Sequence, residues 1–153
     1  MKEKNTTELE NVLKSTHLRD FNTYCRENCD SIISDSNTFS GYVKELLKKK
    51  GILQQRVFLN ADISERYGYK LLSGEKRTKQ RDIMIRIFYA AEFSLQETQR
   101  ALKKYGMSEL YAKNSRDALL MIMFNERPGS ILDVNSILKE HGMQTLRISG
   151  MKE

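Results

Sequence analysis

Apolar residues recur three and four positions apart along most of this chain, which is the spacing of one face of an α-helix. The period predicts helices over 7–14, from about His17 to Ile33, over Phe39–Lys50, over Arg81–Phe93, from Ser94 through Lys104, from Ser115 to about Asn125, and from Ser130 to Gly142. No segment of useful length alternates with the period of two that a half-buried strand requires. We therefore expect an all-α protein.

Residues 51–74, GILQQRVFLNADISERYGYKLLSG, predict two short helices joined by a tight turn. Val57 and Ala61 lie at helical spacing in the first helix. Ser64 is placed to N-cap the second helix, and Gly74 is placed to end it. The basic segment GEKRTKQR follows almost at once. A helix-turn-helix DNA reader needs this arrangement, because a short second helix with a polar outer face can enter a major groove.

The same segment resembles the λ-repressor and Cro type of helix-turn-helix domain. In that family a Gly opens the unit, a Gln starts the first helix, a Ser begins the recognition helix and a second Gly ends it. Gly51, Gln54, Ser64 and Gly74 occupy these places without a gap. The family's apolar core positions hold Val57, Ile63 and Leu71. Three positions differ from the pattern: Phe58 replaces a small residue, Asp62 replaces the turn glycine, and Gly68 replaces an apolar residue.

A wider resemblance, to a longer bacterial subgroup of uncharacterised regulators, covers roughly residues 37–146. It lies in segments similar to YGYKLLSGEKRTKQRD, SLQETQRALKKYGMSELYAKNSRDALL and VNSILKEHGMQTL. The resemblance implies a five-helix reader over 37–106, with an N-terminal helical extension over 1–36 and a C-terminal helical extension over 107–153. We expect the reader's core to contain Val57, Leu71, Ile83, Ile87, Phe88, Ala101 and Leu102.

By position, the resemblance also assigns roles to side chains. Glu65, Arg66, Tyr69 and Lys70 would face base edges, where arginine can bridge the guanine acceptors and glutamate can accept from cytosine. Gln54, Lys76, Arg77 and Lys79 would contact phosphates. A homodimer on a two-fold operator is expected, because one such reader has a small footprint. Residues 107–146 are the better candidate for the dimer interface, and 1–36 is the alternative.

Two features of the second helix leave alternatives open. Tyr67 and Tyr69 point to different faces, so one is expected to pack on the core while the other faces outward, and Tyr69 is the better outward candidate because it flanks Lys70. Gly68 costs about 0.5–1 kcal/mol relative to alanine inside a helix. It either permits the close approach of another helix or of DNA, or marks a short, slightly irregular helix.

The net charge of +6 is concentrated on the predicted reader. Residues 41–106 hold 15 basic and 7 acidic side chains, whereas 1–40 hold 5 and 7, and 107–153 hold 6 of each. A basic patch of this kind attracts a polyanion and releases counterions on contact. The alternative is a basic surface that is only solvated. We favour polyanion binding because the basic excess and the helix-turn-helix motif lie in the same segment.

The residues that could carry other chemistry are few. Cys25 and Cys29 share a predicted helix face, but His17 and His141 are distant in sequence, so we expect reduced thiols and no metal site. Nucleophile elbows, phosphate-binding loops and dinucleotide loops are missing from the sequence, so we expect neither catalysis nor a cofactor. No apolar run approaches the ~20 residues of a membrane span, and MKEKNTTELE lacks a signal-peptide core. We expect a cytoplasmic protein.

The sequence thus favours a double-stranded-DNA-binding transcriptional regulator. A second hypothesis is a protein-interaction module on the same fold, such as a phage- or defence-associated inhibitor, an antitoxin or a scaffold. Glu65 and Glu75 support it somewhat, because they lie within the expected DNA surface and weaken its positive field.

Overall fold

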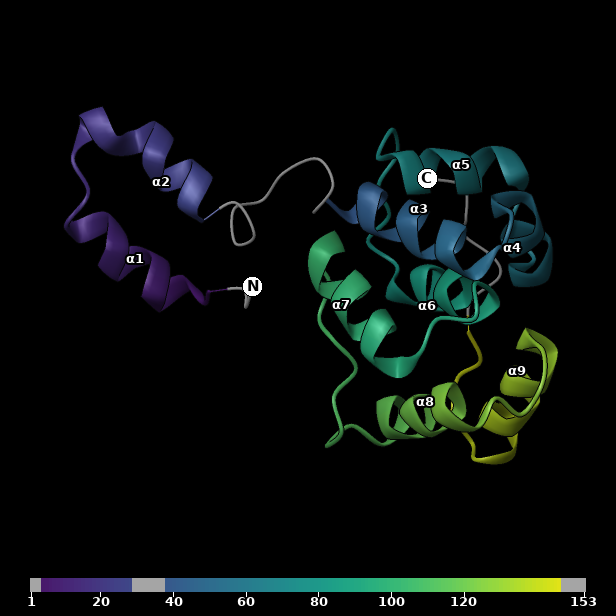
Figure 1. Ribbon diagram of the computed structural model, residues 1–153. Helices are drawn as coiled ribbons and strands as arrows, with labels where there is room; N and C mark the ends of the chain where they lie inside the picture. The colour runs from purple at the N-terminus through teal and green to yellow at the C-terminus, as the bar shows by residue number, and fades with distance from the viewer. Residues whose placement is uncertain (1–3, 29–37, 147–153) are drawn as a thin grey trace. The chain divides into compact units, whose positions relative to one another are not determined.

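One buried helix, α6 (Arg81–Ala90), organises the larger part of the protein in the computed structural model, which describes residues 4–28 and 38–146 (Figure 1). Every residue of α6 from Ile83 to Phe88 is at most 1% exposed, and Tyr89 is 5% exposed. A helix buried on all sides must be apolar around its whole circumference. The IMIRIFY sequence of this segment meets that requirement except at Arg86.

Two compact units make up the chain, residues 1–38 and 39–153. The second unit contains α3 (Phe39–Lys50), α4 (Gln54–Ala61), α5 (Glu65–Ser73), α6, α7 (Leu95–Tyr105), α8 (Ser115–Glu126) and α9 (Ile131–Glu140). Helices α4, α7 and α9 all pack against α6, and α3 packs against α5 and α7. In Figure 1, α6 lies between α5 on one side and the α8–α9 pair on the other.

The expectation of an all-α protein is confirmed for the described residues, which contain no strand. The seven residues expected in the reader's core are all 0% exposed: Val57, Leu71, Ile83, Ile87, Phe88, Ala101 and Leu102. Within the described ranges, no helix has the length and apolar character needed to cross a bilayer.

Most helix ends in the second unit lie where the capping residues predict them. Ser94 and Glu97 form a capping box at the start of α7, and Gly106 ends that helix with φ of 88°. The predicted helix over Arg81–Phe93 is wrong at its end, because α6 stops at Ala90. Glu92 takes a left-handed conformation there, and the turn places Phe93 in the core, stacked on Phe88 with 5.6 Å between ring centroids.

The first unit contains α1 (Thr6–Lys14), a 3-10 turn η1 (Leu18–Asp20) and α2 (Phe21–Glu27). The single helix expected from His17 to Ile33 is therefore wrong at its start, and its part beyond Asn28 lies outside the described residues. Leu18 and Phe21 belong to the apolar stripe whose spacing predicts that helix, and both are exposed. Helical periodicity specifies a long helix only where another surface buries the stripe, and these two side chains lack such burial.

Gly68 fits the packing between α4 and α5. A methyl group at Gly68 would lie 2.4 Å from Cδ1 of Phe58, and Phe58 is only 1% exposed. The large residue on α4 and the missing side chain on α5 are therefore complementary in volume. This confirms the close approach of another helix as the reason for Gly68, and α5 is continuous through it.

We predict that Gly68→Ala destabilises the protein by up to about 2 kcal/mol. The gain in helix propensity is about 1 kcal/mol, but overpacking typically costs about 1–3 kcal/mol. In a Phe58→Ala background the ring is gone, so the same substitution should stabilise by up to about 1 kcal/mol. Urea unfolding of the four chains measures both values, and a stabilising effect of Gly68→Ala in the parent would contradict this account.

Candidate nucleic-acid interface

Helix α5 is held at both ends by local interactions. The Ser64 side-chain oxygen accepts a hydrogen bond from the backbone N–H of Tyr67 at 3.3 Å, which satisfies one of the donors left unpaired at a helix start. Gly74 ends the helix in the left-handed conformation, with φ of 85°. Both roles expected from the sequence are confirmed, so this short helix has defined ends.

The connection between α4 and α5 is short and specified. Asp62 adopts the left-handed conformation, with φ of 56°, that a glycine would usually take in such a turn. Aspartate tolerates this region better than most residues. The next residue, Ile63, donates its N–H to the Phe58 carbonyl at 3.0 Å and is 6% exposed. Its side chain thus anchors the turn to the core.

The two tyrosines of α5 occupy opposite faces, as expected. Tyr67 is 8% exposed, whereas Tyr69 is 41% exposed. The Tyr69 ring packs against the buried Phe58 ring in a T-shaped arrangement, with 5.0 Å between centroids and 79° between planes. A T-shaped aromatic pair limits the orientations of the exposed ring, so Tyr69 presents a defined surface.

The four residues expected to read bases share one face of α5. Glu65, Arg66, Tyr69 and Lys70 follow the one- and four-residue spacing of a helical stripe. Glu65 and Arg66 are exposed and Lys70 is half-buried. The opposite face, made of Tyr67, Gly68, Leu71 and Leu72, is buried. Glu65 lies in the first turn, where a negative charge interacts favourably with the helix dipole.

The residues expected to bind phosphates are arranged less uniformly. Gln54 is the first residue of α4 and is half-buried, and Lys76 and Lys79 are exposed in the segment after α5. The Lys76 ammonium lies 6.0 Å from the centroid of the Tyr67 ring. All three side chains are at least partly exposed to solvent.

Arg77 is expected to contact phosphate, but its guanidinium is engaged within the protein. Its guanidinium stacks 4.3 Å from the Tyr105 ring centroid and donates a hydrogen bond to the Tyr105 carbonyl. The planar guanidinium can satisfy a ring and a carbonyl together. It therefore fastens the segment after α5 to the end of α7, although the residue as a whole is still exposed.

An open hollow of about 800 Å³ lies beside this contact, between the segment after α5 and the end of α7. Its lining includes Arg77, Lys79 and Arg81 on one side and Tyr105 and Ser108 on the other. Part of this basic character is already neutralised, because Arg81 forms an ion pair with Asp117. Lys79 is exposed at this site.

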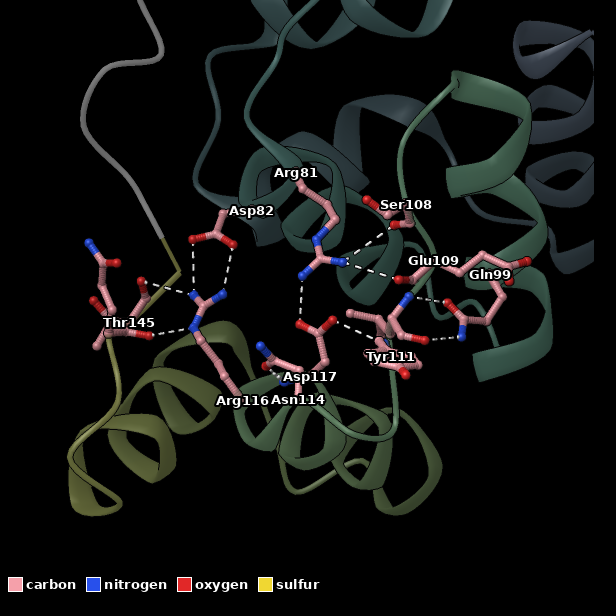
Figure 2. Close-up of polar contacts among 12 residues, drawn as sticks. Arg81, Asp82, Gln99, Ser108, Glu109, Tyr111, Asn114, Arg116, Asp117 and Thr145 are labelled. Atoms are coloured by element: carbon pink, nitrogen blue, oxygen red, sulfur yellow. Dashed lines mark hydrogen bonds and ion pairs between the residues drawn. The ribbon is translucent and has the colours of Figure 1, made fainter.

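Two crossed ion pairs, which the sequence interpretation did not identify, join α6 to α8 (Figure 2). Arg81 on α6 pairs with Asp117 on α8, and Arg116 on α8 donates two hydrogen bonds of 3.0 Å to the Asp82 carboxylate on α6. Asp117 is also held by the N–H of Tyr111. The only signal in the sequence is the dipeptide Arg-Asp, which occurs at the start of both helices.

Among the described residues, no three His, Cys, Asp or Glu side chains gather as a metal ion would require. Cys25 is a free, half-buried thiol, and its expected neighbour Cys29 lies outside the described ranges.

Comparisons of the chain with protein-family models, with curated proteins and with solved structures give no match.

Proposed function

We propose that the protein binds double-stranded DNA as a helix-turn-helix regulator of the λ-repressor and Cro type, with α5 in the major groove. One observation carries the proposal. The outward face of a helix that is capped at both ends and packed on the core consists of Glu65, Arg66, Tyr69 and Lys70. Such a face contributes little to folding and suits base recognition. The proposal assigns no catalytic step to the chain.

The dimensions of α5 suit this role. Nine residues give a length of about 14 Å. The diameter of a helix with its side chains, about 10–12 Å, matches a major groove about 12 Å wide. Arg66 would donate to the guanine acceptors, Glu65 would accept from a cytosine amino group, and the Tyr69 ring would contact a thymine methyl. Lys70, which is half-buried, would lie at the margin of the base contacts.

Phosphate binding would come from side chains around α5. Lys76 and Lys79 follow the helix and are exposed, and Gln54 begins α4. Lysine is a compact, mobile charge, and each phosphate that it neutralises releases a counterion. Arg77 would contribute mainly by holding this segment against Tyr105.

A protein-interaction module on the same helices is the second candidate, and one observation favours it. An apolar hollow of about 380 Å³ beside α4 is lined by Leu53, Phe58, Leu59 and Ile63 among others. Leu53 and Leu59 are 73% and 78% exposed. Exposed leucines beside a hollow suit an apolar side chain of a protein partner.

Selection of bound fragments from a random duplex pool, followed by a salt titration on the selected duplex, separates the two candidates. DNA recognition should enrich a sequence and lose affinity steeply as salt rises, because counterions compete for the phosphates. If the selection enriches no sequence and the remaining binding to duplex DNA does not depend on salt, the result would favour the protein-interaction module.

We predict that Arg66→Ala weakens binding to the selected duplex by about 1–3 kcal/mol and relaxes the preference at one or two base pairs. Lys79→Ala should weaken all duplexes about equally and flatten the salt dependence, because phosphates are the same everywhere. Fluorescence anisotropy with the selected and a scrambled duplex measures both effects.

The matched control for these variants is Lys44→Ala. It removes one exposed positive charge from α3, which contributes no residue to the proposed DNA surface or to the expected dimer interface. It should leave the affinity and the base preference unchanged. An Arg66→Ala protein that discriminates between duplexes like the parent would exclude Arg66 as a base-reading residue.

A homodimer is part of the proposal, and its interface is expected within 107–146. That region exposes Tyr111, Ile122 and Leu132, of which Leu132 is 74% exposed. Leu132→Glu should shift the dimer dissociation constant upward at least about tenfold if the side chain is buried between copies. Multi-angle light scattering across a concentration series measures the shift.

Leu13→Glu is the counterpart for the alternative interface over 1–36, where Leu13 is 47% exposed. It should leave the dissociation constant unchanged. A parent chain that stays monomeric at high micromolar concentration, with and without DNA, would refute the dimer.

A further inference from the structure

The side chain of Arg86 links two distant parts of the second unit. Arg86 is 1% exposed, in the middle of α6. Its Nε donates to the Ala61 carbonyl at 2.9 Å, and its Nη1 donates to the Leu146 carbonyl at 3.2 Å. Ala61 is the last residue of α4, and Leu146 lies in the segment after α9. One guanidinium therefore holds the turn before α5 and the C-terminal segment together.

The burial of Arg86 makes both of these hydrogen bonds necessary. Within the described ranges Arg86 forms no ion pair, and its side chain donates to main-chain carbonyls. Desolvation lowers its pKa, and the charges of Asp62 and Asp82 oppose that shift. A buried charged donor that loses its acceptor incurs most of its desolvation penalty. Release of either carbonyl would therefore favour movement of the guanidinium toward water.

The contact with Ala61 acts at the turn that positions α5. The last carbonyls of a helix have no partner within the helix, and the negative end of the helix dipole attracts a cation. The Ala61 carbonyl is followed by left-handed Asp62 and buried Ile63, and α5 begins at Glu65. A shift of this carbonyl would therefore change the path of the chain into α5.

The contact with Leu146 belongs to a segment that side chains hold through its backbone. The Leu146 N–H donates to the Asn135 side chain of α9 at 2.8 Å. The Gln144 and Thr145 carbonyls accept from Arg116 of α8, at 2.9 and 3.4 Å. Leu146 itself is 1% exposed. Figure 2 shows Arg116 between this segment and Asp82 of α6.

We propose that Arg86 couples residues 143–146 to the α4–α5 turn, so that docking of this C-terminal segment fixes the geometry of the helix pair that reads DNA. Arg86 is a positioning residue in this scheme, since it acts through Ala61 and touches no base. The structural coupling stands by itself, and its effect on DNA binding rests on the proposed function.

Asn135→Ala is the best test, because it loosens Leu146 from a distance and leaves α6 and the turn untouched. Substitution of Arg86 itself would also remove packing from the centre of α6. In the 153-residue chain, Asn135→Ala should speed hydrogen exchange of the Ile63 N–H about tenfold, the factor expected from one lost hydrogen bond. The Ile63 N–H is bonded to the Phe58 carbonyl, so its exchange reports on the turn.

Two controls separate coupling from general destabilisation. The Met107 N–H, bonded to the Leu102 carbonyl at the end of α7, should exchange at the parent rate. Asn135→Asp keeps an acceptor oxygen for Leu146 and should behave like the parent at both amides. Unchanged exchange at Ile63 in Asn135→Ala, or equal acceleration at Ile63 and Met107, would overturn the proposal.

A binding measurement then tests the consequence for function. Asn135→Ala should weaken binding to the selected duplex by about threefold to tenfold, and Asn135→Asp should not. Faster exchange at Ile63 in a protein whose parent binds no duplex would support the coupling and refute the proposed function. Faster exchange with an unchanged duplex affinity would overturn the claim that docking fixes the DNA-reading geometry.

Discussion

The contact between the Phe58 ring and the bare backbone of Gly68 sets the distance between α4 and α5, and the candidate interface depends on it. The ring occupies the volume that a side chain at Gly68 would need. It also supports the edge of Tyr69 on the outward face. Protein interiors are close-packed, so a change of volume at Phe58 or Gly68 would shift the outward face of α5. Phe58 and Gly68, two of the positions that differ from the λ-repressor pattern, therefore compensate each other in volume.

The parts of the fold that sequence reasoning predicted are those determined by neighbours along the chain. Ser64, Ser94, Gly74 and Gly106 each act within one helical turn, so their caps could be inferred without knowing the tertiary structure. The early end of α6 could not be inferred, because Phe93 continues the apolar period of the helix. Its burial against Phe88 decides the turn, and that contact is tertiary.

The arginines show the same limit at the candidate site. In the described part of the second unit, Arg77, Arg81, Arg86, Arg116 and Arg127 all donate to main-chain carbonyls. Three of these lie among residues 41–106, so the basic excess of that region overstates the charge available to a polyanion. Charge counting located a basic excess in this region but could not separate structural arginines from exposed lysines. The distinction is chemical, since a guanidinium fork fits carbonyls that a mobile ammonium would leave in water.

Arg66 differs from those structural arginines. It is exposed on α5, and its side chain forms no hydrogen bond or ion pair with another residue that the structure describes. Its five donors are therefore solvated in the free protein, and their transfer to a partner leaves no internal group unsatisfied. The adjacent Glu65 lowers the local positive potential. This lowering weakens nonspecific attraction to phosphates more than it weakens a bidentate contact between Arg66 and guanine. Under the proposed function, an arginine beside a glutamate on this face would therefore suit discrimination between sequences, while the lysines that follow α5 would supply affinity.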